Sequence, residues 1–314
     1  MNLPELKIGN LVAPIPIIQG GMAVRVSTAP LAAAVANEGG IGIIGASGMG
    51  IDELRDQIRK AKQLTRGIVG VNIMVALANF IKMVKAAIEE KIDLIIAGAG
   101  FSKDLFHLGK DSGIPVVPIV SSLRLAKIAE SLGASAIVVE GKEAGGHLGT
   151  DVSIKELIPS IVNEIKIPVV AAGGIMNGND VAEMFKMGVD GVQMATRFVA
   201  SKECEVSDKF KQIYLNANKE DIVIIRSPVG LPGRAIRNEF SEKLMHGEAP
   251  PPENCDNCLK HCSGEYCILQ ALDNSRLGNT ENGVVFSGEY VYKLKDILTV
   301  KEIFKRILDE VKRY

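Results

Sequence analysis

Val169-Val170-Ala171-Ala172-Gly173-Gly174 is a short apolar run that ends in two glycines, and similar runs that end in glycine or another small residue recur along the first two thirds of the chain. Each run precedes an amphipathic stretch such as Ile51–Ala61, whose apolar residues recur at helical spacing. The runs that fit a buried strand are Ile15–Gln19, Ile41–Gly45, Gly67–Val75, Leu94–Ala97, Val116–Val120, Ala136–Val139, Val169–Ala172 and Gly191–Met194. Eight strand–helix units are what a closed parallel barrel requires, so we predict an α/β fold of the (β/α)8 TIM-barrel class. A doubly wound open sheet shows similar local patterns and ranks second.

The size and charge of the chain indicate an enzyme for small molecules. Its 314 residues are enough for one large core and a smaller appendage. The 36 lysines and arginines balance 37 acidic residues, so no charge excess attracts nucleic acid or an anionic membrane. The N-terminus lacks the pattern of a secretion signal, and no apolar stretch reaches the roughly 18 residues of a membrane span. We therefore expect a cytoplasmic protein.

The strand–helix rhythm stops after Phe198. Helices are predicted near Ser207–Ala217 and Glu265–Ser275, with a proline-rich turn between them. A last helix is predicted near Val300–Val311, where apolar residues recur at a spacing suited to docking on the barrel. We expect three parts: the barrel at residues 1–200, a lid inserted at residues 201–290, and a C-terminal helix at residues 291–314 that returns to the barrel.

The ends of the seventh and eighth predicted strands carry a candidate phosphate site. Gly173 and Gly174 follow the seventh strand, and Ala195 and Thr196 follow the eighth. Glycines let backbone N–H groups approach an anion, and the Thr196 hydroxyl can donate a further hydrogen bond. The alternative is that the two glycines only permit a tight turn.

The ends of the first and third predicted strands carry further candidates. Gly20, Gly21 and Met22 follow the first strand, where glycines would let the backbone lie against a flat ring system, or would simply form a turn. Asn72 is a lone amide inside a strongly apolar strand, so it needs a partner if it is buried. A cofactor edge and an internal network are equally good partners.

The loop after the sixth predicted strand carries the candidate catalytic residue. In Glu143-Ala144-Gly145-Gly146-His147-Leu148-Gly149, a histidine lies between glycines on the face where barrel enzymes place their active sites. An imidazole titrates near neutral pH, so His147 can exchange a proton with a substrate; the alternative is a surface-loop histidine. Glu140, at the strand's end, would contact a cofactor or be satisfied by backbone N–H groups.

Taken in order, these motifs resemble the nitronate monooxygenase (2-nitropropane dioxygenase) superfamily, which also contains the FMN-dependent enoyl-acyl-carrier-protein reductase of type II. The resemblance covers roughly residues 14–240 and the stretch from residue 283. It implies a flavoprotein with an FMN barrel and a lid, with His147 as the catalytic, proton-handling residue. It also implies that the flavin contacts Gly20, Gly21, Met22, Asn72, Glu140, Gly145, Gly173, Gly174, Ala195 and Thr196.

The two branches of this superfamily perform different reactions. The reductase uses NAD(P)H to reduce an enoyl thioester, such as one on an acyl carrier protein, whereas the monooxygenase oxidises a nitronate with oxygen. The fifth strand is apolar at Val117–Val120, where some nitronate monooxygenase-like members carry a lysine, and Glu140 replaces an aspartate. Both features resemble the reductase branch, which we expect here, with the monooxygenase as the alternative. A homodimer is compatible with either.

Cys255, Cys258, Cys262 and Cys267 form a compact cluster that neither branch requires. Four thiolates this close suit a single four-ligand centre, so we predict an iron–sulfur cluster, with zinc or metal-free thiols as alternatives. His261 can replace one cysteine as a ligand. The cluster is the sole support for a different function, a metal-linked electron-transfer or sensor component without its own turnover.

Arg234 and Arg237 lie in the segment that joins barrel and lid. They would meet a cofactor or substrate phosphate, or take part in ordinary ion pairs. Ion pairs and solvated arginines are the commoner case.

Overall fold

A computed structural model describes residues 1–252 and 254–314 and shows a closed barrel of eight parallel strands. The order around the barrel is β10-β11-β3-β4-β5-β6-β7-β8, and β8 pairs with β10 to close it. The strands are β3 (Ile17–Gln19), β4 (Ile41–Gly45), β5 (Ile68–Met74), β6 (Leu94–Gly98), β7 (Val116–Val120), β8 (Ile137–Glu140), β10 (Val169–Ala172) and β11 (Gly191–Met194). The predicted (β/α)8 barrel is confirmed, and the predicted strand ends differ by at most two residues.

The strands are apolar throughout because both of their faces are buried. Ile18 belongs to the cluster inside the barrel, whereas its neighbour Ile17 packs in the layer between strands and helices. An N-terminal hairpin of β1 (Leu6–Ile8) and β2 (Leu11–Ala13) adds Leu6 and Ile8 to the inner cluster. The sequence analysis did not predict this hairpin, which closes the end of the barrel opposite the candidate site.

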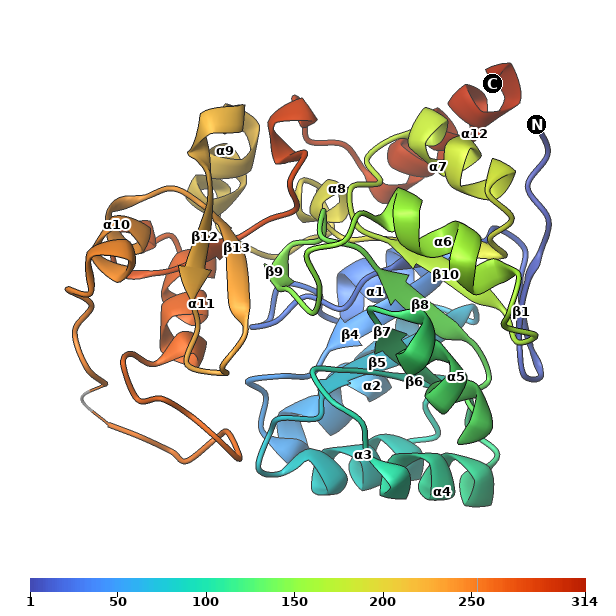
Figure 1. The fold of residues 1–314 in the computed structure, drawn as a ribbon, viewed down its shortest axis with the longest axis horizontal. Helices are drawn as coiled ribbons and strands as arrows, with labels where there is room; N and C mark the ends of the chain where they lie inside the picture. Colours follow the sequence, from blue (N-terminus) through green and yellow to red (C-terminus); the bar gives the residue numbers. More distant parts are fainter. Residues whose placement is uncertain (253) are drawn as a thin grey trace.

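Seven helices cover the outside of the barrel: α1 (Ala29–Asn37), α2 (Ile51–Leu64), α3 (Phe80–Glu89), α4 (Lys103–Ser112), α5 (Leu123–Ser131), α6 (Ile154–Val162) and α7 (Gly178–Lys186). After β11 comes only the single turn α8 (Thr196–Val199). The eighth place in the ring is taken by α12 (Val300–Arg313), which packs against α7 and α1 (Figure 1). Within the described ranges, no helix combines the length and the apolar composition that a bilayer crossing requires.

The lid lies to one side of the barrel (Figure 1). Its elements are α9 (Asp208–Asn216), β12 (Ile222–Arg226), β13 (Pro232–Ile236), α10 (Glu239–His246), α11 (Ile268–Arg276) and β14 (Val285–Phe286), with 3-10 turns at Lys219–Asp221, Thr280–Asn282 and Val291–Lys293. The helices α9 and α11 lie where helices were predicted. The hairpin of β12 and β13 was not predicted, and neither was α10.

A two-residue strand from the barrel joins the lid sheet. β9 (Gly146–His147) lies in the loop after β8, and it pairs antiparallel with β13 of the lid. β13 also pairs with β12 and β14. The loop that carries His147 is therefore held by the lid as well as by the barrel.

Candidate active site

A cavity of about 810 Å³ lies between the C-terminal ends of the barrel strands and the lid. Every predicted catalytic and cofactor residue lines it: His147, Gly20, Gly21, Met22, Asn72, Glu140, Gly145, Gly173, Gly174, Ala195 and Thr196. The fold thus brings together loops that are widely separated in sequence. Their individual roles remain predictions.

The turn after β10 and the end of β11 lie together at one part of this cavity. Gly173 and Gly174 have φ angles of 106° and 74°, in the left-handed region that favours glycine. A Cβ at Gly174 would lie 2.8 Å from Cε2 of Tyr290. Thr196 Oγ1 accepts a hydrogen bond from Gly288 N at 3.0 Å, which leaves its hydroxyl proton free to donate. The glycines are therefore required by the turn, and the turn faces the cavity.

The loop after β3 approaches β5 closely. A Cβ at Gly21 would lie 2.3 Å from Cβ of Asn72, so only glycine fits there. Asn72 Nδ2 donates to the Gly21 carbonyl at 3.4 Å. Asn72 thus has the internal partner that was one of its two expectations, and because it also lines the cavity, a contact with a cofactor edge stays a prediction. The loop is further fixed where Met22 N donates to Ser27 Oγ at 2.8 Å.

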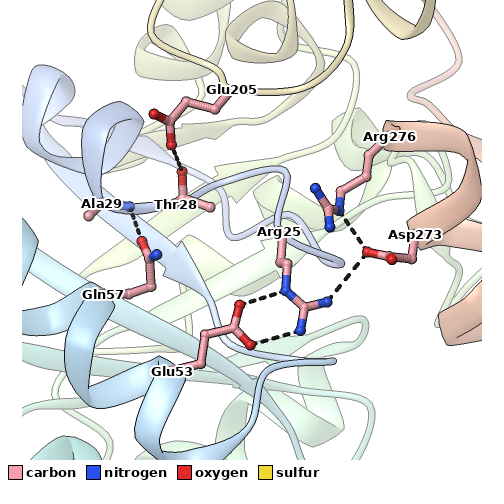
Figure 2. Close-up of polar contacts among 8 residues, drawn as sticks. All are labelled: Arg25, Thr28, Ala29, Glu53, Gln57, Glu205, Asp273 and Arg276. Atoms are coloured by element: carbon pink, nitrogen blue, oxygen red, sulfur yellow. Dashed lines mark hydrogen bonds and ion pairs between the residues drawn. The ribbon is translucent and has the colours of Figure 1, made fainter. Parts of the chain in front are cut away.

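Arg25 ties this loop to both the barrel and the lid (Figure 2). Its guanidinium makes two hydrogen bonds to the Glu53 carboxylate on α2, at 2.5 and 2.7 Å. A third reaches Asp273 on the lid helix α11 at 3.4 Å, and Asp273 also accepts from Arg276 at 2.7 Å. The loop that carries three predicted cofactor residues is therefore anchored on two sides.

His147 is held by the lid. Its Nε2 lies 2.7 Å from Oγ of Ser227, which follows β12, and its ring packs edge-on against Phe286 with centroids 5.1 Å apart. Burial lowers the pKa of His147 to about 4. The imidazole is therefore neutral at pH 7, so it has one nitrogen that carries a proton and one that accepts.

Glu140 ends β8 and faces the cavity. Burial raises the pKa of its carboxyl group to about 7. In the part of the chain that the structure describes, its carboxyl oxygens accept no hydrogen bond, so the alternative of satisfaction by backbone N–H groups is not what the structure shows. At neutral pH this carboxyl is shared between its protonated and ionised forms.

Two further polar residues on the cavity wall were not predicted. Gln193 Oε1 and Ser287 Oγ are buried and have no hydrogen-bond partner among the described residues. Buried polar atoms are normally paired, so these two indicate partners on a bound ligand. Gln193 is a polar residue inside an apolar strand, the same signal that Asn72 gave, whereas nothing local distinguishes Ser287.

Arg234 is a buried residue that supports the His147 loop. Its Nη1 donates to the carbonyl oxygens of Ala144, at 2.8 Å, and of Lys142, and its guanidinium lies 3.5 Å from the Glu289 carboxylate. Arg237 is exposed and pairs with Glu242. Both arginines therefore make internal or surface interactions, the commoner of the two expectations.

The cysteine segment runs from the lid to the barrel. We call residues 258–263 the strap. Cys258 O accepts from Ala78 N at 2.9 Å, and Lys260 N donates to Ala76 O at 2.9 Å, both in the loop after β5. At its other end Ser263 N donates to Pro228 O at 3.0 Å, in the turn between β12 and β13. The strap thus borders the cavity, and its residue His261 lines the cavity wall.

The four-thiolate centre predicted at Cys255, Cys258, Cys262 and Cys267 is not preformed. All four are free thiols, two exposed and two partly buried. Over residues 1–252 and 254–314, no three Cys, His, Asp or Glu side chains converge as a metal site requires. Burial raises the pKa of the Cys258 thiol, and the neighbouring thiols of Cys267, Cys262 and Cys255 raise it further.

Comparisons with known proteins agree on one family. The family model described as nitronate monooxygenase matches residues 5–310. A (3aS,4S,5R,7aS)-5-hydroxy-7a-methyl-1-oxo-octahydro-1H-indene-4-carboxyl-CoA dehydrogenase of Rhodococcus jostii (strain RHA1) is 31% identical and covers 95% of this chain and 93% of its own. A probable nitronate monooxygenase of Staphylococcus aureus (strain Newman) is 33% identical, over 76% of this chain and 79% of its own.

A solved structure extends the agreement to three dimensions. FabK from Thermotoga maritima is 36% identical, covers 95% of this chain and 93% of its own, and superposes with a TM-score of 0.87. The family model spans the barrel, the lid and most of α12. The resemblance noted from the motifs is confirmed: the chain belongs to the nitronate monooxygenase family and is an oxidoreductase of that family.

Proposed function

We propose that this protein is an FMN-dependent oxidoreductase that uses NAD(P)H to reduce an enoyl thioester. One observation carries the proposal: His147 shares a single cavity with all the residues that the family resemblance assigns to the flavin. The lid side of that cavity is apolar, with Ile268, Leu269 and Leu272 of α11 in its wall. An apolar wall suits an acyl chain.

The residues present fit an FMN. The unpaired Ser287 Oγ and the Thr196 hydroxyl lie near the Gly173–Gly174 turn and can donate to a phosphate. The unpaired Gln193 Oε1 can accept from an N–H group on the edge of a ring. Bound FMN would supply hydride transfer between the nicotinamide and the β-carbon of the thioester.

The chain's own residues would supply the proton and the surroundings. His147 would give a proton to the α-carbon. Its neutral state, and the raised pKa of Glu140, reduce the charge that these two residues would bring near the reacting double bond. The lid would limit the access of bulk water to the reacting groups. The relative from Rhodococcus jostii is named for a carboxyl-CoA substrate, which supports a thioester here as well.

The test is an anaerobic absorbance experiment on the purified protein. NADH or NADPH is expected to bleach a flavin spectrum, and crotonyl-CoA is then expected to restore it. In the variant His147→Gln, NADH or NADPH should still bleach the flavin spectrum. Crotonyl-CoA should restore it about 100-fold more slowly because proton delivery is lost. His107→Gln, which changes an exposed histidine on α4, is the matched control. Protein that contains no flavin, even after reconstitution, would overturn the proposal.

The second candidate is the oxidation of an alkyl nitronate by oxygen. The relative from Staphylococcus aureus favours it, as does a neutral His147 that can accept a proton. It predicts oxygen uptake when a nitronate is added without NAD(P)H. A flavin that neither nucleotide reduces, together with such uptake, would establish this function over the first.

A further inference from the structure

The lid determines how the His147 ring is oriented. β9 pairs with β13 so that His147 lies opposite Gly233, and Leu148 N donates to Pro232 O at 2.8 Å. These bonds fix the backbone of the residue. The ring is fixed on one side by the edge-on contact with Phe286, at an interplanar angle of 75°. On another side Nε2 meets the Ser227 hydroxyl at 2.7 Å.

The protons around Ser227 can be assigned from their donors and acceptors. Val229 N donates to Ser227 Oγ at 3.4 Å, so the oxygen already accepts one hydrogen bond. Tyr266, whose hydroxyl is also within hydrogen-bonding reach of Ser227, gives its own proton to the Arg226 carbonyl at 2.9 Å. The Ser227 proton can therefore go to Tyr266 or to His147. The imidazole nitrogen is the stronger acceptor, because its lone pair is basic and that of a phenol is delocalised.

We propose that Ser227 is a positioning residue: it donates its hydroxyl proton to Nε2 of His147 and so holds the imidazole in the tautomer that carries its proton on Nδ1. Among the described residues Nδ1 makes no hydrogen bond, and His147 lines the cavity. Nδ1 is thus the nitrogen left for a ligand. Nothing in the sequence marks Ser227, which lies 80 positions from its partner.

The consequence for chemistry rests on the proposed function. A proton on the nitrogen left for a ligand suits delivery to a carbon of the substrate; the Ser227 hydroxyl bonded to Nε2 would stabilise the anionic ring that results until water returns the proton. Abstraction of a proton from a neutral nitroalkane would need a bare nitrogen at the same place, whereas an alkyl nitronate has already lost that proton. Ser227 therefore favours proton delivery at this site over proton abstraction.

The tautomer can be measured without any substrate. The chain has only four histidines, so protein labelled with 15N-histidine gives few imidazole signals, and His147→Gln identifies the one of interest. Between pH 6 and 8 the wild type is expected to show a neutral ring with the proton on Nδ1. In Ser227→Ala the same signal should show a mixture of tautomers, and Ser227→Thr should restore the wild-type pattern. A wild-type ring protonated on Nε2, or an unchanged ring in Ser227→Ala, would overturn the inference.

Ser241→Ala is the matched control for this measurement. Ser241 is a buried lid serine that bonds only within its own helix cap at Asn238. Its loss is expected to lower the stability of the lid while the His147 tautomer stays as in the wild type. Because these spectra need no turnover, failure of the tautomer assignment and failure of the proposed reaction are separate results.

A kinetic cycle shows whether Ser227 acts through His147. Ser227→Ala is expected to slow the recovery of the flavin spectrum by crotonyl-CoA about tenfold, the effect of one hydrogen bond. In the His147→Gln background the same change should have no further effect. Equal slowing in both backgrounds would show that Ser227 is only a structural part of the lid, and would overturn its positioning role.

Discussion

Glu140 and His147 show how one physical cause can act in opposite directions on two residues of the same site. Burial disfavours the charged form of each group, so it raises the pKa of the carboxyl to about 7 and lowers that of the imidazole to about 4. Both groups therefore tend to be neutral near pH 6. Under the proposed function, two neutral groups at this place suit the transfer of hydride to an uncharged double bond.

The raised pKa of Glu140 predicts a pH-dependent gain of stability in Glu140→Gln. The folded state holds the carboxyl proton up to about pH 7, whereas the unfolded chain loses it near 4.5. Ionisation thus destabilises the fold increasingly as the pH rises from 4.5 through 7. In flavin-free protein, Glu140→Gln should gain about 1–2 kcal/mol more at pH 8 than at pH 5, after allowance for water in the cavity.

Urea unfolding of both proteins at the two pH values measures this difference. Glu248→Gln, which removes an exposed carboxylate, controls for the general effect of net charge. The same gain at both pH values would show that the carboxyl of Glu140 is not held in its protonated form.

At the scale of elements, what could be predicted depended on whether the signal was local. The barrel strands were predicted because a strand buried on both faces is an apolar run, and the site glycines and His147 because they follow such runs. β9 has two residues, and β13 begins at Pro232 and contains Arg234, so neither has the apolar run by which a strand is recognised in a sequence. Ser227 was missed for the same reason: its role exists only through a contact with a distant loop.

The loop between β3 and α1 provides the prediction for this scale. Arg25 has a φ of 54°, which an alanine tolerates poorly and a glycine well. Arg25→Ala removes the contacts to Glu53 and Asp273 and also leaves a strained backbone, whereas Arg25→Gly removes only the contacts. We expect both variants to bind FMN more weakly, because the loop that carries Gly20 to Met22 is released.

Fluorescence titration of the apoproteins with FMN and thermal unfolding separate the two effects. Arg25→Gly should weaken FMN binding about as much as Arg25→Ala but lower the stability less, by about 1 kcal/mol. The control is Arg59→Ala, which removes an arginine on the outer surface of α2 that pairs with Glu90. FMN binding of wild-type strength in Arg25→Gly would show that the Arg25 contacts do not support FMN binding by the loop that carries Gly20 to Met22.

For the whole molecule, the order of the chain links the lid to the closure of the barrel. The chain leaves the barrel after α8, builds the lid, and returns as α12 to fill the gap between α7 and α1. Gly178 N, at the start of α7, donates to the Glu310 carboxylate at 2.7 Å. A Cβ at Gly178 would lie 2.3 Å from Ile307 O, so the two helices touch closely. The last helix is therefore part of the barrel and not an appendage.

Removing residues 300–314 should consequently unfold the barrel and not only loosen one helix. The deletion takes away Ile303, Phe304, Ile307 and Val311, all at most 2% exposed, and uncovers the strands beneath them. At about 1.5–3 kcal/mol for each buried side chain, the loss is roughly 6–12 kcal/mol, comparable with the entire stability of a typical domain, about 5–15 kcal/mol. Circular dichroism and limited proteolysis should show a largely unfolded chain.

Removal of residues 312–314 alone, which are exposed, should leave the fold intact. If the longer deletion kept a cooperative unfolding transition near that of the full chain, α12 would be dispensable and the ring of seven helices would suffice to close the barrel.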